Sequence, residues 1–281
     1  MRLKGISRSR NIEDRRGRSR GRGRAAGGLG IGGILIVLVI GWVTGVDVMP
    51  LLSGGQAPAT TSSTDLTEAD ARAGDFAARV LATTEAVWSR EFPQQVDQVY
   101  TPPVMVLYSG VTQSPCGNAS GATGPFYCPA DQKAYLDTAF FTTMRDRLGA
   151  GGDFAAAYVI AHEVAHHVQN ELGILGQIHR ARQQATQTEA NGLTVRSELM
   201  ADCFSGIWAR NVGDLMERGD LEEALNAARM IGDDHLQRQA GRVPQPHTFT
   251  HGTSEQRARW FQRGYDSGMM ADCDTFAARS L

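Results

Sequence analysis

The segment from His162 to His166 constrains this chain more than any other stretch, because it reads His-Glu-x-x-His. Residues four apart on an α-helix lie on one face, so the two imidazoles can hold one zinc ion between them. Glu163 lies one position further round the helix, where its carboxylate can accept a proton from water without ligating the metal. A pattern with only three fixed positions also occurs by chance, so two surface histidines beside an acid are the alternative.

The residues around this motif predict an amphipathic helix. Asp153 can cap its start after two glycines, and Gly173 follows its last apolar residue. The apolar residues between them recur at helical spacing and would bury one face, with the histidines on its flank: Ala157, Ile160, Ala161, Val164 and Val168. This setting favours the metal site, in a pattern typical of zinc peptidases.

A catalytic zinc ion takes three protein ligands and leaves one position for water, so a third ligand must follow the motif. The metzincin arrangement needs a glycine and then a histidine at fixed positions downstream. Gln169 and Leu172 stand at those positions, so this class is excluded.

Glu198 is the candidate for the third ligand, on a helix predicted from about Thr194 to Ala209. Asp202 shares a helix face with Glu198 and can accept a hydrogen bond from a ligand histidine, which fixes the tautomer of that ring. A solvated acidic face is the alternative. Apolar neighbours on the same helix oppose it: Leu199, Cys203, Ile207 and Trp208.

His251 and Arg257 are candidates for stabilising the oxyanion of a tetrahedral intermediate. His251 precedes a predicted helix that begins with a capping box, and Arg257 lies in the first turn of that helix. For Arg257 the alternative is an ion pair that holds Glu198 or Asp202 in place. His167 points to another face of its helix and is expected to be structural.

Charge is distributed unevenly: residues 1–24 hold ten of the 28 Lys and Arg but two of the 30 Asp and Glu, giving +8 there and −10 elsewhere. Residues 27–46 carry no charge, and a helix of that length spans the roughly 30 Å hydrocarbon layer. We therefore predict a single-pass protein of the cell membrane. Its parts are a basic cytoplasmic arm (1–26), a transmembrane helix (27–46), a flexible linker (47–69) and an extracytoplasmic domain (70–281). A cleaved signal peptide is the alternative.

The four cysteines of a domain outside the cytoplasm favour disulfide bonds. Cys116 and Cys128 flank a loop that contains Gly and Pro, so we expect them to pair with each other. This leaves Cys203 to pair with Cys273. A four-cysteine zinc site is the alternative, and the lack of any Cys-x-x-Cys in the sequence opposes it.

The domain is expected to be α+β and mainly helical. A helix carrying Phe76 and Trp88 is predicted to stop before Pro93, and strands are predicted at Val104–Tyr108 and Lys133–Asp137. In zinc peptidases the substrate pairs with an edge strand beside the active-site helix. Lys133–Asp137 is either that edge or an ordinary core strand.

Six stretches of the sequence stand out together: Asn11-Ile-Glu-Asp-Arg-Arg-Gly17, Gly124-Pro-Phe-Tyr-Cys-Pro129, His162-Glu-Val-Ala-His-His-Val-Gln169, Glu198-Leu-Met-Ala-Asp-Cys203, Ile231-Gly-Asp-Asp234 and His251-Gly-Thr-Ser-Glu-Gln-Arg257. On these stretches, nearly the whole chain resembles the bacterial neutral zinc metallopeptidase family of membrane-anchored proteins. The resemblance implies a zincin-like fold and a peptidase site. The series of His162, Glu198 and His251 motifs is also similar to that of the heat-shock-type and prenyl-protein-processing metallopeptidases, which usually have proline where Gly252 stands.

From this site we expect a membrane-anchored endopeptidase with one zinc ion per chain, held by His162, His166 and Glu198, and with Glu163 as general base. Its partners would be peptide or protein substrates and the membrane. A zinc-binding envelope protein without hydrolytic activity is a second hypothesis. A membrane-surface or nucleic-acid binder acting through the arginine-rich arm is a third. The apolar run after the arm favours the membrane, and no nucleic-acid partner is expected.

Overall fold

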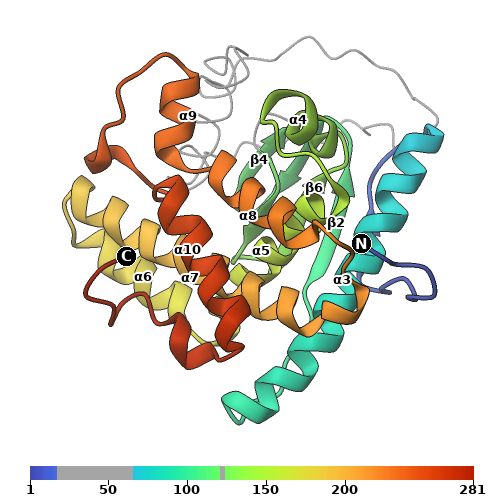
Figure 1. The fold of residues 1–281 in the computed structure, drawn as a ribbon, viewed down its shortest axis with the longest axis horizontal. Coiled ribbons are helices and arrows are strands. Elements are labelled where there is room, and N and C mark those ends of the chain that lie inside the picture. The colour runs from blue at the N-terminus through green and yellow to red at the C-terminus, as the bar shows by residue number, and fades with distance from the viewer. Residues whose placement is uncertain (18–65, 121–123) are drawn as a thin grey trace.

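The structure, a computed structural model, describes residues 1–17, 66–120 and 124–281 and is α+β and mainly helical, as predicted (Figure 1). Its strands are β1 (Ile12–Asp14), β2 (Val104–Tyr108), β3 (Val111–Ser114), β4 (Gly117–Ser120), β5 (Phe126–Cys128) and β6 (Lys133–Asp137). Its helices are α3 (Glu68–Gln95), α4 (Phe140–Arg147), α5 (Asp153–Glu171), α6 (Ile174–Gln183), α7 (Gln187–Asn211), α8 (Asp220–Met230), α9 (Asp233–Gln239) and α10 (Ser254–Ser267). Short 3₁₀ turns follow at η1 (Gly213–Leu215), η2 (Pro246–Thr248) and η3 (Met270–Cys273).

The main sheet has the strand order β1-β2-β6-β5. β1, β2 and β6 are parallel, whereas β5 runs antiparallel to β6. Both predicted strands are confirmed, but β6 pairs on both sides and is therefore not an edge. The edge beside the helix α5 is the short strand β5, and β3 and β4 form a separate hairpin.

Helix α3 begins with a capping box in which Thr67 and Asp70 satisfy each other's backbone amides. The prediction that it stops before Pro93 is wrong, because the helix continues to Gln95. A proline this close to a helix end removes only one internal hydrogen bond. The amide of Val96 still donates to the carbonyl of Phe92, which closes the last turn.

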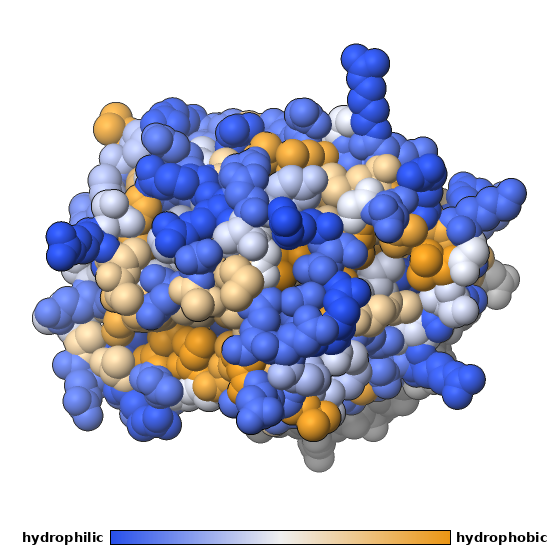
Figure 2. Space-filling view, turned by 60° about the horizontal axis from the view of Figure 1, so that its bottom comes forward, coloured by the Kyte–Doolittle hydropathy of each residue, from blue (hydrophilic) through white to orange (hydrophobic). Residues whose placement is uncertain are grey.

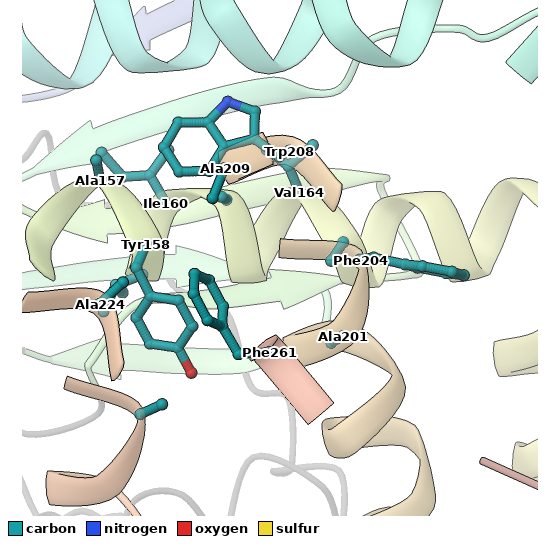
Figure 3. Packing of buried hydrophobic residues seen from close by; sticks show 14 of the residues in the cluster. Ala157, Tyr158, Ile160, Val164, Ala201, Phe204, Trp208, Ala209, Ala224 and Phe261 are labelled. Carbon is teal, nitrogen blue, oxygen red and sulfur yellow. The ribbon is translucent and has the colours of Figure 1, made fainter. Parts of the chain in front are cut away.

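Helix α5 carries the motif through the centre of the molecule and is buried along most of its length. Asp153, the expected cap, begins the helix without capping it, and the amide of Phe154 donates instead to Glu223 of α8 at 3.0 Å. The apolar face of α5 packs against α7, α8 and α10, as Figure 3 shows for Ala157, Tyr158, Ile160, Val164, Ala201, Phe204, Trp208, Ala209, Ala224 and Phe261. Most of the face seen in Figure 2 is hydrophilic, and hydrophobic side chains gather in a few patches, the largest of them at the lower left.

Helices α7 and α10 approach each other closely enough to require glycine on both. A Cβ on Gly206 would lie 2.0 Å from the carbonyl oxygen of Phe261, and one on Gly264 would lie 1.8 Å from that of Cys203. Helix α7 is longer than predicted, because a capping box at Thr186 starts it at Gln187. This close contact holds α10 against α7, the helix that carries Glu198.

Both predicted disulfides are present, Cys116–Cys128 and Cys203–Cys273. The second joins α7 to the end of η3 and holds the C-terminal segment on the contact between α7 and α10. Cys128 is the last residue of β5, so the first disulfide ties the edge strand to the β3–β4 turn.

The N-terminal segment packs against the domain. Its strand β1 pairs with β2, and the side chain of Met1 lies in the hydrophobic core, 7% exposed. Within the ranges that the structure describes, no helix is long and apolar enough to cross a membrane. The predicted transmembrane helix at 27–46 lies outside those ranges.

We expect the two disulfides to stabilise the fold to different degrees. The chain-entropy relation gives about 4 kcal/mol for closing the loop of 70 residues at Cys203–Cys273, and about 3 kcal/mol for the loop of 12 at Cys116–Cys128. Denaturant unfolding of the two double Cys→Ser variants measures both losses. Equal stability of wild type and the Cys203/Cys273 variant would contradict the structural role of that bond.

Candidate metal centre

Three side chains from two helices converge on one point. Nε2 of His162 lies 3.1 Å from Glu198 Oε2, and Nε2 of His166 lies 3.4 Å from Glu198 Oε1. One ligand atom from each of the three residues lies within 4.8 Å of the others. The structure therefore brings together the predicted ligand set, with the histidines on α5 and the glutamate on α7.

The spacing of these atoms fits a zinc ion. Zinc bonds to nitrogen and oxygen are about 2.0–2.1 Å long, so two ligand atoms at a tetrahedral centre lie about 3.3 Å apart. The two histidine nitrogens lie close to this distance from Glu198, each from a different oxygen of its carboxylate. Two imidazoles and one carboxylate are also an established ligand set for catalytic zinc. The residues thus fit zinc in both geometry and donor chemistry.

His162 is backed by a buried carboxylate. Its Nδ1 lies 3.0 Å from Oδ1 of Asp202, close enough for ion pairing, although the ring N–H is not well aligned for a hydrogen bond. Asp202 is fully buried and also accepts a hydrogen bond of 2.5 Å from the hydroxyl of Tyr158. The predicted role of Asp202 behind a ligand histidine therefore agrees with its position.

Arg257 does not face the metal centre. Its guanidinium donates from Nε and Nη2 to the two oxygens of Asp202, both at 2.9 Å, and it is 1% exposed. Nη2 also contacts the Tyr158 hydroxyl at 3.2 Å. Nε and Nη2 are thus engaged within the protein, and Nη1 lies 3.4 Å from the carbonyl oxygen of Ile231. The alternative role, an ion pair that holds Asp202, is the one observed.

His166 is oriented by a residue to which the sequence assigned no role. Its Nδ1 lies 2.9 Å from Oε1 of Gln169, whose side-chain amide donates to the carbonyl of Ser197 on α7 at 2.7 Å. Gln169 is fully buried. These contacts leave Nε2 of His166 directed at Glu198. Gln169 is the last residue of the His162–Gln169 stretch that carries the family resemblance. Its place in that stretch was the one indication in the sequence that it has a role at this site.

The electrostatics of the site favour a cation. Burial opposes ionisation of Glu198, but the charge of His166 and hydrogen bonds to both histidines outweigh it and hold the pKa of Glu198 well below its usual range. Burial also disfavours charge on His162, yet contacts with Asp202 and Glu198 raise its pKa to about 9. Glu198 therefore stays ionised, and its negative charge favours a cation between the two histidines.

Glu163 follows the first ligand and is 9% exposed. Its carboxylate has no hydrogen-bond partner within the described part of the chain. Burial raises its pKa above the ordinary value for glutamate. A more basic, unpaired carboxylate beside the ligand set is suited to accept and return a proton.

His251 lies near the ligand set and is held by Asp233. Its Nδ1 lies 3.1 Å from Oδ1 of Asp233, while Oδ2 of the same carboxylate accepts the backbone amides of Thr250, His251 and Gly252 at 2.6, 2.6 and 3.1 Å. Burial lowers the pKa of His251, but Asp233 and then the charge of Glu198 outweigh this and raise it. Sequence reasoning missed Asp233, although it lies in the quoted Ile231–Asp234 stretch.

His167, expected to be structural, joins α5 to the edge strand. Its Nδ1 lies 3.0 Å from the hydroxyl of Tyr127 on β5, and its Nε2 lies 2.6 Å from the carbonyl of Thr101. Burial lowers its pKa, which favours the neutral ring. The contact with Tyr127 fixes β5 beside α5, and the contact with Thr101 holds the chain just before β2 against the same helix.

The site thus combines a His-Glu-x-x-His helix, α5, with a glutamate from a second helix, α7. The chain belongs to the family described as "Putative neutral zinc metallopeptidase", whose model matches residues 1–276.

Two relatives illustrate the similarity. "Uncharacterized protein YpfJ" of Escherichia coli (strain K12) is 47% identical over 285 residues, which cover 98% of this chain and 99% of that protein. "Uncharacterized protein Rv2575" of Mycobacterium tuberculosis (strain ATCC 25618 / H37Rv) is 43% identical over 219 residues, or 72% of this chain and 71% of that protein. No solved structure matches the chain.

We expect the Asp202→Asn variant to lose both stability and metal affinity. It leaves the guanidinium of Arg257 buried without a counter-charge, which costs about 3 to 5 kcal/mol of unfolding free energy. Loss of the carboxylate behind His162 weakens zinc binding about 10- to 100-fold. Denaturant unfolding and zinc titration measure the two effects.

The control is Tyr158→Phe, which removes only the hydroxyl that donates to Asp202. It should cost about 1 kcal/mol and leave zinc affinity nearly unchanged. If Asp202→Asn bound zinc as tightly as this control, the role of Asp202 behind His162 would be refuted.

Proposed function

We propose that the protein is a zinc-dependent endopeptidase. The observation that carries this proposal is the convergence of His162, His166 and Glu198, whose ligand atoms lie within 4.8 Å of one another, with Glu163 beside them. Membership of the metallopeptidase family supports the same reaction. A zinc-binding protein without hydrolytic activity is the second hypothesis, and the position of Glu163 argues against it.

Zinc held at this centre would lower the pKa of a coordinated water towards about 7 and polarise the scissile carbonyl. Glu163 accepts the proton of the attacking water and returns it to the leaving amine. Asp202 and Gln169 fix the rings of His162 and His166, so that each presents Nε2. The residues of the chain therefore divide into ligands, a proton carrier and groups that orient the ligands.

His251 is the proposed donor to the oxyanion. Asp233 engages its Nδ1, which leaves Nε2 free to donate, and the raised pKa favours the protonated ring. A positive imidazolium near the ligand set would stabilise negative charge that develops on the carbonyl oxygen. Arg257 no longer competes for this role, because Asp202 holds its guanidinium.

The substrate would lie extended along β5. This strand is the antiparallel edge of the main sheet, and His167 and Tyr127 tie it to α5. The edge strand of a sheet has backbone N–H and C=O groups with which an extended peptide can pair. A sheet with such an edge beside the metal-binding helix supports a zincin-like architecture and a peptide or protein substrate.

The ligand assignment predicts that the purified full-length chain binds one zinc ion, and that Glu198→Ala loses it or binds it far more weakly. Removing one of three protein ligands leaves too few donors for a stable site. Elemental analysis after dialysis measures the zinc content. Glu222→Ala, at an exposed position on α8, is the matched control and should retain zinc. Unchanged zinc content in Glu198→Ala would show that the third ligand lies elsewhere.

The proton-transfer role predicts that Glu163→Gln keeps its zinc and loses hydrolysis of quenched fluorescent peptides by about 10²- to 10⁴-fold. His162→Ala should lose both zinc and hydrolysis. Circular dichroism checks that each variant is folded. Cleavage by Glu163→Gln at the wild-type rate would exclude Glu163 as general base, and a zinc-loaded wild type that cleaves no peptide would favour the non-hydrolytic hypothesis.

A further inference from the structure

Residues 1–17 are the part of the predicted basic arm that the structure describes, and from here on they are called the arm. The arm contacts the domain at several independent places. In Figure 1 it runs beside α3, and its strand β1 extends the main sheet. The register pairs Ile12 with Met105 and Asp14 with Leu107. Backbone hydrogen bonds of 2.8 Å continue this ladder at both ends, from Met105 to Asn11 and from Arg15 to Leu107.

Charged and polar contacts fasten the rest of the arm. Glu85 of α3 accepts hydrogen bonds from Ser9 at 2.5 Å and Asn11 at 2.9 Å. Glu13 pairs with Lys133 of β6 at 2.6 Å, and these contacts with Arg15 and Lys133 lower the pKa of Glu13 to about 2. The arm therefore uses its acids as well as its backbone to bind the domain.

The start of the arm lies against the metal-binding helix. The amino group of Met1 contacts Asp153, the first residue of α5, at 2.8 Å, and Glu217 and Asp220 at 2.9 and 3.2 Å. Arg16, at the other end of the arm, is 8% exposed and donates to the backbone of α3 at Asp70. Both ends of the arm are thus fixed to the domain.

From these contacts we infer that the arm and the domain lie on the same side of the membrane. Paired strands lie about 4.8 Å apart, whereas the hydrocarbon layer is roughly 30 Å thick. A single crossing between residues 17 and 66 would separate β1 from β2. The expected arrangement, with a cytoplasmic arm and an extracytoplasmic domain, is incompatible with this pairing. The conclusion also holds if the arm pairs with a neighbouring copy, because that copy's β2 would occupy the same compartment.

Cysteine labelling of the full-length protein tests this inference. The described residues contain no free cysteine, so Ser7→Cys in the arm and Thr188→Cys in the domain each add one thiol at an exposed position. Right-side-out spheroplasts are treated with a membrane-impermeant maleimide before and after lysis, with wild type as the background control. We expect the two positions to behave alike, both labelled before lysis or both only after it. Labelling of one position before lysis and of the other only after it would overturn the inference.

Hydrogen exchange tests the docking itself on the purified full-length protein. Peptides that cover β1 should exchange slowly, as peptides from β2 do, because β1 is paired with β2 and the amide of Arg15 donates to the carbonyl of Leu107. Exchange of the arm at the rate of an unstructured peptide, with β2 still protected, would show that the arm is not part of the domain and would remove the basis of the inference.

Discussion

The buried pair of Asp202 and Arg257 is the interaction on which the site depends. Two charges buried away from water are stable only when they pair with each other. The carboxylate of Asp202 pairs with Arg257, accepts a hydrogen bond from the Tyr158 hydroxyl and lies against the ring of His162. One side chain thus ties α5, α7 and α10 together. The glycine contact between α7 and α10 brings Arg257 within reach. Fold and metal centre therefore share one set of contacts.

Local spacing was enough to predict most of the ligand set. His162 and His166 are four apart on one helix, and Glu198 and Asp202 are four apart on another, so helical geometry alone orients each pair. The two disulfides followed from compartment and loop composition. That the two helices face each other could not be read from spacing, yet the chemistry of zinc required a third ligand and so indicated the contact.

The predictions failed where the answer depended on partners far away in the chain. The residue pattern predicts the bounds of β6 but not which strands pair with it. That β6 is a central strand and β5 an edge strand is seen only in the strand order of the sheet. Asp233 orients His251 across a loop that no local pattern reports. From the sequence, Arg257 could contact either the substrate or a buried carboxylate of the protein. Its position against Asp202 is known only from the structure.

The docked arm also shapes how this chain can fold. Met1 and Arg2 contact Leu215, Glu217 and Asp220, which lie more than two hundred positions later in the chain and are synthesised after them. Contacts of such long sequence separation slow folding. During synthesis β2 must remain without its outer neighbour or pair with β1 before the rest of the arm has a binding surface. The fold is therefore complete only after α8 has formed, when Met1 can contact both Asp220 of α8 and Asp153 at the start of α5.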